Sequence, residues 1–357
     1  MAGVYISYPF CAQKCTYCNF ASGVFPKDLE PVYQWRLMAE ITETKWQWNP
    51  ETVYLGGGTP SLWELNDLKA VLHSIPGGPW REATMEAAPG SLTDERVEGW
   101  MELGINRVSL GVQSFVEKEI RRTGRKHTAK IVADDVALLK RHGIGDINVD
   151  LISGLAEQTR ESWEQSLDGA LALQVPHVSV YILEVDEESR LGKEVLLNGK
   201  RFGAPDIPSD DLQAEFYERA VERLAEAGIQ RYEISNFAMR GHESIHNLKY
   251  WRLEPYIGFG ADAHSFDGTW RWQNVEDVKA YALGTDSSSK RELADPENEK
   301  YWVGLRLSEG VVAGSRFDEQ ISRLVGDGLL EWQGERIRLT PRGVLLSNEV
   351  FQEFLGH

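Results

Sequence analysis

The stretch Pro9-Phe10-Cys11-Ala12-Gln13-Lys14-Cys15-Thr16-Tyr17-Cys18-Asn19-Phe20 contains the only cysteines of the chain, spaced as Cys-x3-Cys-x2-Cys. Four-iron clusters are held by cysteine thiolates, normally four of them. Three thiolates without a fourth leave one iron open to a small molecule that carries an amine and a carboxylate. One alternative is three buried, inert cysteines, which pack like small apolar side chains. Another is a disulfide, which the odd count and the tight spacing do not favour.

Further blocks in the chain are GGGTPS at residues 56–61, EAAPG at 86–90, GVQSF at 111–115 and DLISGL at 150–155. Together with the cysteine motif, they resemble the radical S-adenosylmethionine (SAM) superfamily and, within it, the oxygen-independent coproporphyrinogen oxidase group. That group includes the HemN enzyme and the HemW haem chaperone, and the resemblance extends over nearly the whole chain. It implies a [4Fe–4S] cluster on Cys11, Cys15 and Cys18, with S-adenosylmethionine at the open iron.

The composition is that of a soluble globular protein, with 26% charged and 42% hydrophobic residues among 357. The net charge of −17 argues against nucleic-acid binding, which needs a basic face to neutralise phosphates. The chain has no run of about 18 apolar residues that would predict a membrane span. Its start lacks the basic and apolar regions of a secretory signal. Because thiols and a cluster need reducing surroundings, we expect a cytoplasmic protein.

Predicted strands alternate with predicted helices of about ten or more residues along most of the chain. Such alternation is typical of βαβ units with a parallel sheet, and the resemblance implies an α/β fold, a partial (β/α)6 radical SAM barrel. Several motifs directly follow strands, where the active sites of (β/α) barrels gather. Strands are predicted at residues 4–8, 52–55, 83–87, 107–110, 146–151 and 177–183, and helices at 29–48, 94–103, 129–142, 160–173 and 212–227.

The alternation ends after residue 266, and residues 286–290 with 294–296 have the composition of a polar connection. We therefore predict two domains, residues 1–285 with the cluster, S-adenosylmethionine and haem sites, and residues 286–357. The second domain resembles the winged-helix C-terminal domain of the same group. A winged helix by itself does not assign DNA binding, and the acidity of the chain argues against it.

Polar residues and glycines of the blocks match positions that bind S-adenosylmethionine in the group. Glycine lets a backbone approach a ligand closely, carboxylates accept hydrogen bonds from amines and hydroxyls, and arginine pairs with carboxylates. The alternatives are a plain strand-to-loop turn for the glycines and ordinary ion pairs for the charged residues. By resemblance, the S-adenosylmethionine site consists of Tyr5, Tyr17, Gly57, Gly58, Thr59, Glu86, Gln113, Arg125 and Asp150.

Two features favour the haem-chaperone branch. The HemN enzyme has another cysteine two positions after the third ligand, where this chain and HemW-type proteins have phenylalanine, here Phe20. The His-Asn-x-x-Tyr-Trp motif associated with the chaperones is present as His246, Asn247, Tyr250 and Trp251. A neutral imidazole can be an axial haem ligand, and aromatic rings can stack on a porphyrin. The alternative is a core histidine with packing aromatics. We predict a haem site at this motif.

The first functional hypothesis is therefore a chaperone that binds the cluster, S-adenosylmethionine and haem, and delivers haem to acceptor proteins. Respiratory and membrane-associated proteins are among the candidate acceptors, and a homodimer is among the expected assemblies.

The second hypothesis is an enzyme in which the reduced cluster cleaves S-adenosylmethionine to methionine and a 5′-deoxyadenosyl radical. That radical would act on coproporphyrinogen III or on another substrate, while the protein orients the reactants and excludes water. HemN has a leading segment before its cluster strand, and we expect this chain to lack it, which favours the chaperone. The third hypothesis is a non-catalytic module whose winged helix recruits a partner.

Overall fold

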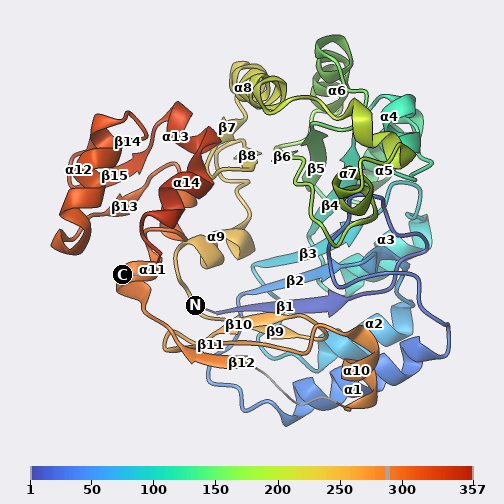
Figure 1. Ribbon diagram of the computed structural model, residues 1–357. Helices are drawn as coiled ribbons and strands as arrows, with labels where there is room; N and C mark the ends of the chain where they lie inside the picture. Colours follow the sequence, from blue (N-terminus) through green and yellow to red (C-terminus); the bar gives the residue numbers. More distant parts are fainter. Residues whose placement is uncertain (1, 286–289, 356–357) are drawn as a thin grey trace.

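The computed structural model describes residues 2–285 and 290–355 (Figure 1). Within these residues, one twelve-stranded sheet has the order β12-β11-β10-β9-β1-β2-β3-β4-β5-β6-β8-β7. Its strands are β1 Gly3–Tyr8, β2 Thr52–Gly57, β3 Glu82–Ala87, β4 Arg107–Gln113, β5 Asp146–Ser153, β6 His177–Ile182, β7 Gln230–Arg231, β8 Asn236–Ala238, β9 Tyr256–Phe259, β10 His264–Phe266, β11 Trp270–Gln273 and β12 Lys290–Leu293.

The strands from β1 to β6 run parallel and form the wall of a partial barrel. Because successive side chains of a strand point to opposite faces, each strand packs apolar residues against the helices and directs polar residues inward. In β4, for example, Val108 and Leu110 are fully buried in the core, whereas Ser109 lines the interior of the barrel. The sheet continues into antiparallel β8 and β7 on one side and parallel β9 on the other. The predicted α/β fold with a partial barrel is confirmed.

Helices pack around the outside of this wall (Figure 1). Trp63, Trp100 and Trp163 are fully buried in the core. Within the described parts of the chain, no helix is both long enough and apolar enough to cross a bilayer. The helices of this part are α1 Leu29–Glu43, α2 Leu65–His73, α3 Asp94–Glu102, α4 Glu117–Arg122, α5 Ala129–Arg141, α6 Arg160–Ala172, α7 Arg190–Leu196, α8 Asp210–Glu226, α9 Ile245–Trp251 and α10 Val278–Leu283, with 3₁₀ helices η1 Pro60–Leu62 and η2 Arg201–Asp206.

Two differences from the predicted helices have local causes. The first helix ends at Glu43 instead of residue 48, because Thr44 adopts an extended backbone with φ −66° and ψ 126°. Helix α2 was not predicted, nor were α4, α7, α9 and α10, whose six or seven residues are too few to display a helical period.

The C-terminal part contains a three-stranded sheet in the order β13-β15-β14, with helices packed beside it. The boundary predicted after residue 285 stays a prediction; β12, which lies beyond it, pairs with β11 of the large sheet. Residues 286–289 of the predicted polar connection lie outside the described residues. The elements of this part are α11 Pro296–Glu299, η3 Gly304–Arg306, β13 Val311–Val312, η4 Ser315–Phe317, α12 Asp318–Gly326, β14 Leu330–Gln333, β15 Arg336–Leu339, α13 Pro341–Leu345 and α14 Ser347–Gln352.

Candidate functional site

The three cysteines lie on the loop that follows β1, at the carboxyl end of the parallel strands. Backbone hydrogen bonds fix this loop to two neighbouring segments. The N–H of Thr59, after β2, donates to the Phe10 carbonyl at 3.0 Å, and the N–H of Thr16 donates to the Thr123 carbonyl at 3.1 Å. The loop is therefore held by the protein itself, next to the glycine run and to the turn after α4.

The cysteine thiols are free and half-buried. Burial raises the pKa of the Cys11 thiol, hydrogen bonds with Thr59 and Ser22 lower it, and the neighbouring Cys18 and Cys15 raise it again. Among the described residues, no three His, Cys, Asp or Glu side chains converge as ligands of one metal ion do. A four-iron cluster does not require this convergence, because each thiolate binds a different iron. The donor set thus fits a [4Fe–4S] cluster with one iron free of a protein ligand.

Gly57, Gly58 and Thr59 lie where β2 ends, against the cysteine loop. Gly57 has a φ of 103°, a left-handed backbone that favours glycine. A Cβ added at Gly58 would lie 2.7 Å from the backbone carbon of Pro9. These glycines were predicted to let a ligand approach the backbone. At Gly58, the atoms that approach closely belong to Pro9 and Phe10 of the cysteine loop. The contact of Gly57, Gly58 and Thr59 with S-adenosylmethionine stays a prediction.

Glu86 is a half-buried residue on the inner face of β3. Its Oε1 accepts a hydrogen bond from the Tyr54 hydroxyl at 2.9 Å, and its Oε2 accepts one from the Gly57 N–H at 3.2 Å. Burial, reinforced by the nearby Asp150 carboxylate, raises the pKa of Glu86 to about 7, although these hydrogen bonds oppose the shift. A cationic group placed beside Glu86 would therefore favour its ionised form.

The two tyrosines predicted for the site lie on different segments. Tyr5 lies on β1, and burial and the Glu86 carboxylate both raise the pKa of its hydroxyl. Tyr17 lies in the cysteine loop, where burial raises its pKa and the neighbouring Arg125 guanidinium lowers it.

Gln113 ends β4 at an irregularity, where the register with β5 shifts and its φ is 71°. A non-glycine residue seldom adopts this backbone, and such strain is concentrated at functional sites. Arg125 donates from Nη1 to the Gly111 carbonyl at 2.7 Å. Its buried Nε has no hydrogen-bond partner among the described residues. A Cβ added at Gly111 would lie 3.1 Å from Gln113 Nε2 and 3.4 Å from Arg125 Nη1, so both side chains lie over the same glycine.

Asp150 extends the polar group to β5. It accepts hydrogen bonds from Ser109 Oγ at 3.2 Å and Asn148 Nδ2 at 2.7 Å. Burial raises the pKa of Asp150, and hydrogen bonds from Ser179, Asn148 and Ser109 lower it. Of the predicted S-adenosylmethionine residues, those in or near the cysteine loop are Tyr17, Gly58, Thr59, Gln113 and Arg125. Those that line or adjoin the interior of the barrel are Tyr5, Gly57, Glu86 and Asp150.

The barrel interior is polar around a cavity of about 50 Å³, which Glu86 and Asp150 help to line, and this polarity was not predicted. The sequence contains a pattern that indicates this polarity, because polar residues recur at every second position of β3 to β6. Two buried groups that line the cavity, Thr84 Oγ1 and Arg107 Nη2, have no hydrogen-bond partner among the described residues. Such space suits ordered water or the polar part of a ligand. The lining residues that were not predicted include Tyr54, Thr84, Arg107, Asn148, His177 and Ser179.

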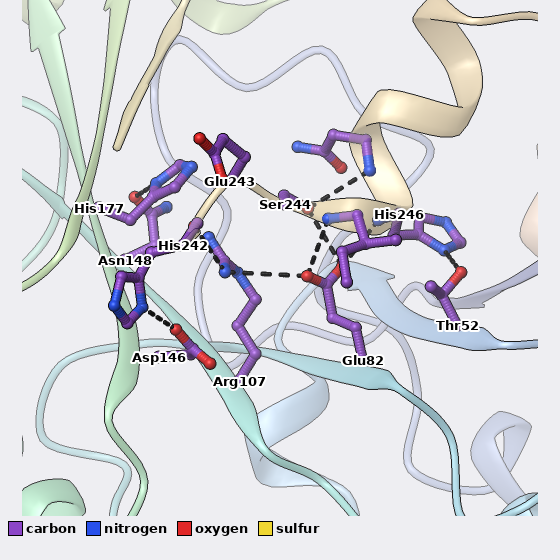
Figure 2. Close-up of polar contacts among 12 residues, drawn as sticks. Thr52, Glu82, Arg107, Asp146, Asn148, His177, His242, Glu243, Ser244 and His246 are labelled. Carbon is purple, nitrogen blue, oxygen red and sulfur yellow. Dashed lines mark hydrogen bonds and ion pairs between the residues drawn. The ribbon is translucent and has the colours of Figure 1, made fainter. Parts of the chain in front are cut away.

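The amino end of the barrel is closed by residues 232–247, which we call the floor segment. Five parallel strands bind this segment with their first residues, and Figure 2 shows these contacts for β2, β3, β4 and β5. These residues are Thr52 of β2, Glu82 of β3, Arg107 of β4, Asp146 of β5 and His177 of β6.

Glu82 provides the most extensive of these contacts. Its carboxylate accepts hydrogen bonds from the N–H groups of Ile245 at 2.9 Å and His246 at 2.7 Å, in the first turn of α9. These N–H groups have no partners within the helix, and a negative charge is favoured at a helix N-terminus. Glu82 also lies 3.8 Å from Arg107, and both side chains are buried.

His246 belongs to this floor, at the end of the barrel opposite the cysteines. It is fully buried, with Nδ1 2.8 Å from Thr52 Oγ1 and Nε2 2.8 Å from the Tyr250 hydroxyl. Burial, with a smaller contribution from Lys249, lowers the pKa of His246 to about 3, so the ring is neutral near pH 7. Both ring nitrogens are engaged within the protein, and neither is open to a haem iron in this arrangement. The haem site predicted here stays a prediction.

The other residues of the predicted haem motif contact three different parts of the molecule. Asn247 lines the barrel cavity. The Tyr250 ring packs edge-on against Tyr256, with centroids 4.6 Å apart. The Trp251 ring faces the Arg306 guanidinium of the C-terminal part at 5.1 Å. In the described structure, Asn247, Tyr250 and Trp251 therefore contact the barrel cavity, β9 and the C-terminal part, respectively, and do not line one shared pocket.

Comparisons with known proteins agree with the cysteine loop and the partial barrel. The profile described as Radical SAM superfamily matches residues 5–170. Proteins described as heme chaperone HemW are 35% identical in Bacillus subtilis, over 100% of both chains, and 34% identical in Lactococcus lactis, over 98% of this chain and 96% of that one. The relative with the same description in Escherichia coli is 30% identical over 99% of this chain and 98% of its own.

A solved structure, coproporphyrinogen III oxidase (HemN) from Escherichia coli, aligns with a TM-score of 0.83 over 99% of this chain and 89% of that one. Its sequence identity of 19% limits that likeness to the fold. The full-length relatives at 30% identity or more decide the family, because their similarity extends from the cysteine loop through the C-terminal part. The chain belongs to the HemW family of the radical SAM superfamily.

Proposed function

We propose that the chain is a haem chaperone that holds a [4Fe–4S] cluster and S-adenosylmethionine and delivers haem to acceptor proteins. The observation that carries the proposal is the identity of 34–35%, over nearly the full length, to proteins described as heme chaperone HemW. Membership of the superfamily implies the cluster and S-adenosylmethionine. Haem as cargo, haem-accepting proteins as partners, a cytoplasmic location and a homodimer are parts of the proposal.

In this proposal, Cys11, Cys15 and Cys18 hold the cluster, and Glu86 and Arg125 bind the amine and carboxylate of S-adenosylmethionine. The free Nε of Arg125 supports this role, because a buried donor without a partner is satisfied by an added carboxylate. A reduced cluster of this type supplies one electron to the bound sulfonium. The protein orients the ligand.

Haem binding at His246 would require a rearrangement, because Thr52 and Tyr250 engage both ring nitrogens. An iron–nitrogen bond would replace one of these hydrogen bonds and bring the buried ring to an open surface. We therefore propose that haem binds a state in which α9 has moved from the floor, and that His246 then provides an axial ligand.

The test is an anaerobic haem titration of the cluster-reconstituted protein, followed by Soret absorbance. We expect saturable binding near one haem per chain, which His246→Ala weakens at least about tenfold and which the exposed His264→Ala retains. Tyr250→Phe removes the competing hydrogen bond to Nε2 and should tighten binding about fivefold, since one such bond contributes about 1 kcal/mol.

The outcomes separate the parts of the proposal. Equal haem affinity in all variants would move the haem site away from His246 and leave the chaperone function standing. Absence of saturable binding in the unmodified chain would overturn the chaperone function. Formation of 5′-deoxyadenosine from S-adenosylmethionine under reducing conditions would then support the radical enzyme.

A further inference from the structure

Cationic side chains gather beside the cysteine loop, although the chain carries a net charge of −17. Most of them lie on α4 and the turn that follows it. We call the set the cationic collar, and it consists of Lys14, Lys118, Arg121, Arg122 and Lys126.

The collar directly adjoins the loop that would hold the cluster. The Thr16 N–H donates to the Thr123 carbonyl at 3.1 Å, and the Gln13 amide donates to the Gly124 carbonyl. Helix α7 closes the other side, where the Leu191 N–H donates to the Thr16 carbonyl at 2.8 Å. In Figure 1, α4 and α7 accordingly lie at the same end of the barrel. A protein docked on α4 would therefore lie next to the cysteines.

The collar is available to a partner. The side chain of Arg121 is 75% exposed and that of Lys118 is 66% exposed. Arg121 pairs with the exposed Glu117, and Lys118 with Glu157, and surface pairs of this kind contribute at most about 1 kcal/mol. Carboxylates of another protein can replace these partners at little cost.

An apolar side chain lies within the same region. Phe20, two positions after Cys18, is 65% exposed. The Lys14 Nζ donates to the backbone carbonyl of Phe20 at 3.2 Å, so Phe20 lies next to a residue of the collar. Redox encounters use small interfaces, where complementary charges steer the approach and set the orientation.

We propose that the cationic collar and Phe20 form the docking surface of an acidic one-electron carrier protein. The reduced carrier loses one electron, the cluster on the cysteine loop gains it, and no bond or proton changes place. A small acidic protein fits better than a membrane or a nucleic acid, because an extended anionic surface would also meet the acidic remainder of the chain. The inference rests on the proposed cluster, not on haem delivery.

The sign of the salt effect tests the proposal on the unmodified protein. A carrier that responds to the net charge of −17 is repelled, so screening by salt would raise its rate of reduction of the cluster. A carrier that docks on the collar is attracted, so its rate should fall at least about tenfold between about 0.02 M and 0.3 M salt. The measurement is stopped-flow reduction of the reconstituted cluster by a reduced, acidic plant-type [2Fe–2S] ferredoxin.

A charge-reversal pair tests the location. Arg121→Glu/Lys126→Glu should slow reduction by ferredoxin at low salt about tenfold or more. The matched control, Lys69→Glu/Lys279→Glu, makes the same charge change on exposed residues of α2 and α10 and should reduce at nearly the unmodified rate. Rates are expressed per reconstituted cluster, and Arg121→Gln/Lys126→Gln replaces the reversal if the latter holds less iron. Calorimetric titration with oxidised ferredoxin measures binding without any electron transfer.

The outcomes differ from those that bear on the proposed function. A rate that rises with salt, or equal rates in the collar and control variants, would overturn the docking surface. Failure of the unmodified chain to assemble a cluster that dithionite reduces would instead overturn the proposed cofactor.

Discussion

At the scale of single residues, Glu86 is a half-buried carboxyl that accepts hydrogen bonds from Tyr54 and Gly57 and has a pKa raised to about 7. Because the folded-state pKa lies above the value of about 4.3 in an unfolded chain, the protonated form stabilises the fold. That contribution is complete below about pH 4 and is lost as the pH rises through about 7. A bound cation offsets the loss, because it stabilises the ionised carboxylate.

We therefore predict that Glu86 makes S-adenosylmethionine binding pH-dependent. Between pH 6 and pH 7.5 the ionised fraction of a carboxyl with a pKa of about 7 increases about eightfold. The affinity of the unmodified protein, relative to Glu86→Gln, should increase by the same factor. Calorimetric titration of the reconstituted protein measures it, and an affinity ratio that does not change with pH would remove Glu86 from the ligand site.

At the scale of elements, α9 is held against the barrel by the strands that surround it, more than by its own seven residues. Short isolated helices are marginal in water. Here Glu82 accepts hydrogen bonds from the first turn, and Thr52 holds the His246 ring 2.8 Å away. Helix α9, which contains the family motif, is therefore stabilised mainly by its contacts with the first residues of the strands. Movement of α9 must first break these hydrogen bonds.

Glu82→Ala should destabilise the protein by about 3 kcal/mol, because it leaves Arg107 buried without its carboxylate and removes the contact at the start of α9. Equilibrium urea denaturation measures the loss. The control is Glu64→Ala, which removes an exposed partner of Arg96 and should change the free energy of unfolding by no more than about 0.5 kcal/mol. Similar effects of the two substitutions would contradict the role given to the floor.

At the scale of the whole molecule, the C-terminal part contacts the barrel at α9 (Figure 1) and also at residues 231–233, where the Ser308 N–H donates to the Tyr232 carbonyl at 2.9 Å. The Arg306 guanidinium of η3 lies 5.1 Å from the Trp251 ring and 4.8 Å from the Phe351 ring, between α9 and α14. A cation between two aromatic rings is attracted electrostatically by both rings, and this attraction is stronger when the cation is partly removed from water. A displacement of α9 would therefore also disturb the contact between Trp251 and Arg306 of the C-terminal part.

Arg306→Ala should loosen this contact and lower stability by about 1–2 kcal/mol. Hydrogen exchange should accelerate in residues 296–355 before it does in β1 to β6. Arg323→Ala, which removes an exposed pair with Glu353 in the same part of the chain, should leave the exchange pattern unchanged. Uniform acceleration across the whole chain would instead show that Arg306 acts on global stability.

Much of the fold was predictable from the sequence, because the strands of the barrel carry their own signal. In β4 and β5, apolar residues directed to the core alternate with polar residues directed inward. The short helices α4 and α7 were not predictable from the period, although both adjoin the cysteine loop. Their positions follow from contacts with the loop.

The sequence by itself determined that three thiols are available within one short segment as cluster ligands. Cys11, Cys15 and Cys18 are so close in the sequence that no distant residue is needed to bring them together. Only the tertiary structure decided the surroundings of His246, whose partner Thr52 is 194 positions away in the chain. Closure of the strands around the floor segment buries the imidazole and engages both of its nitrogens. A local motif can specify which residue types are present, whereas burial and hydrogen-bond partners depend on which distant strands the fold brings beside it.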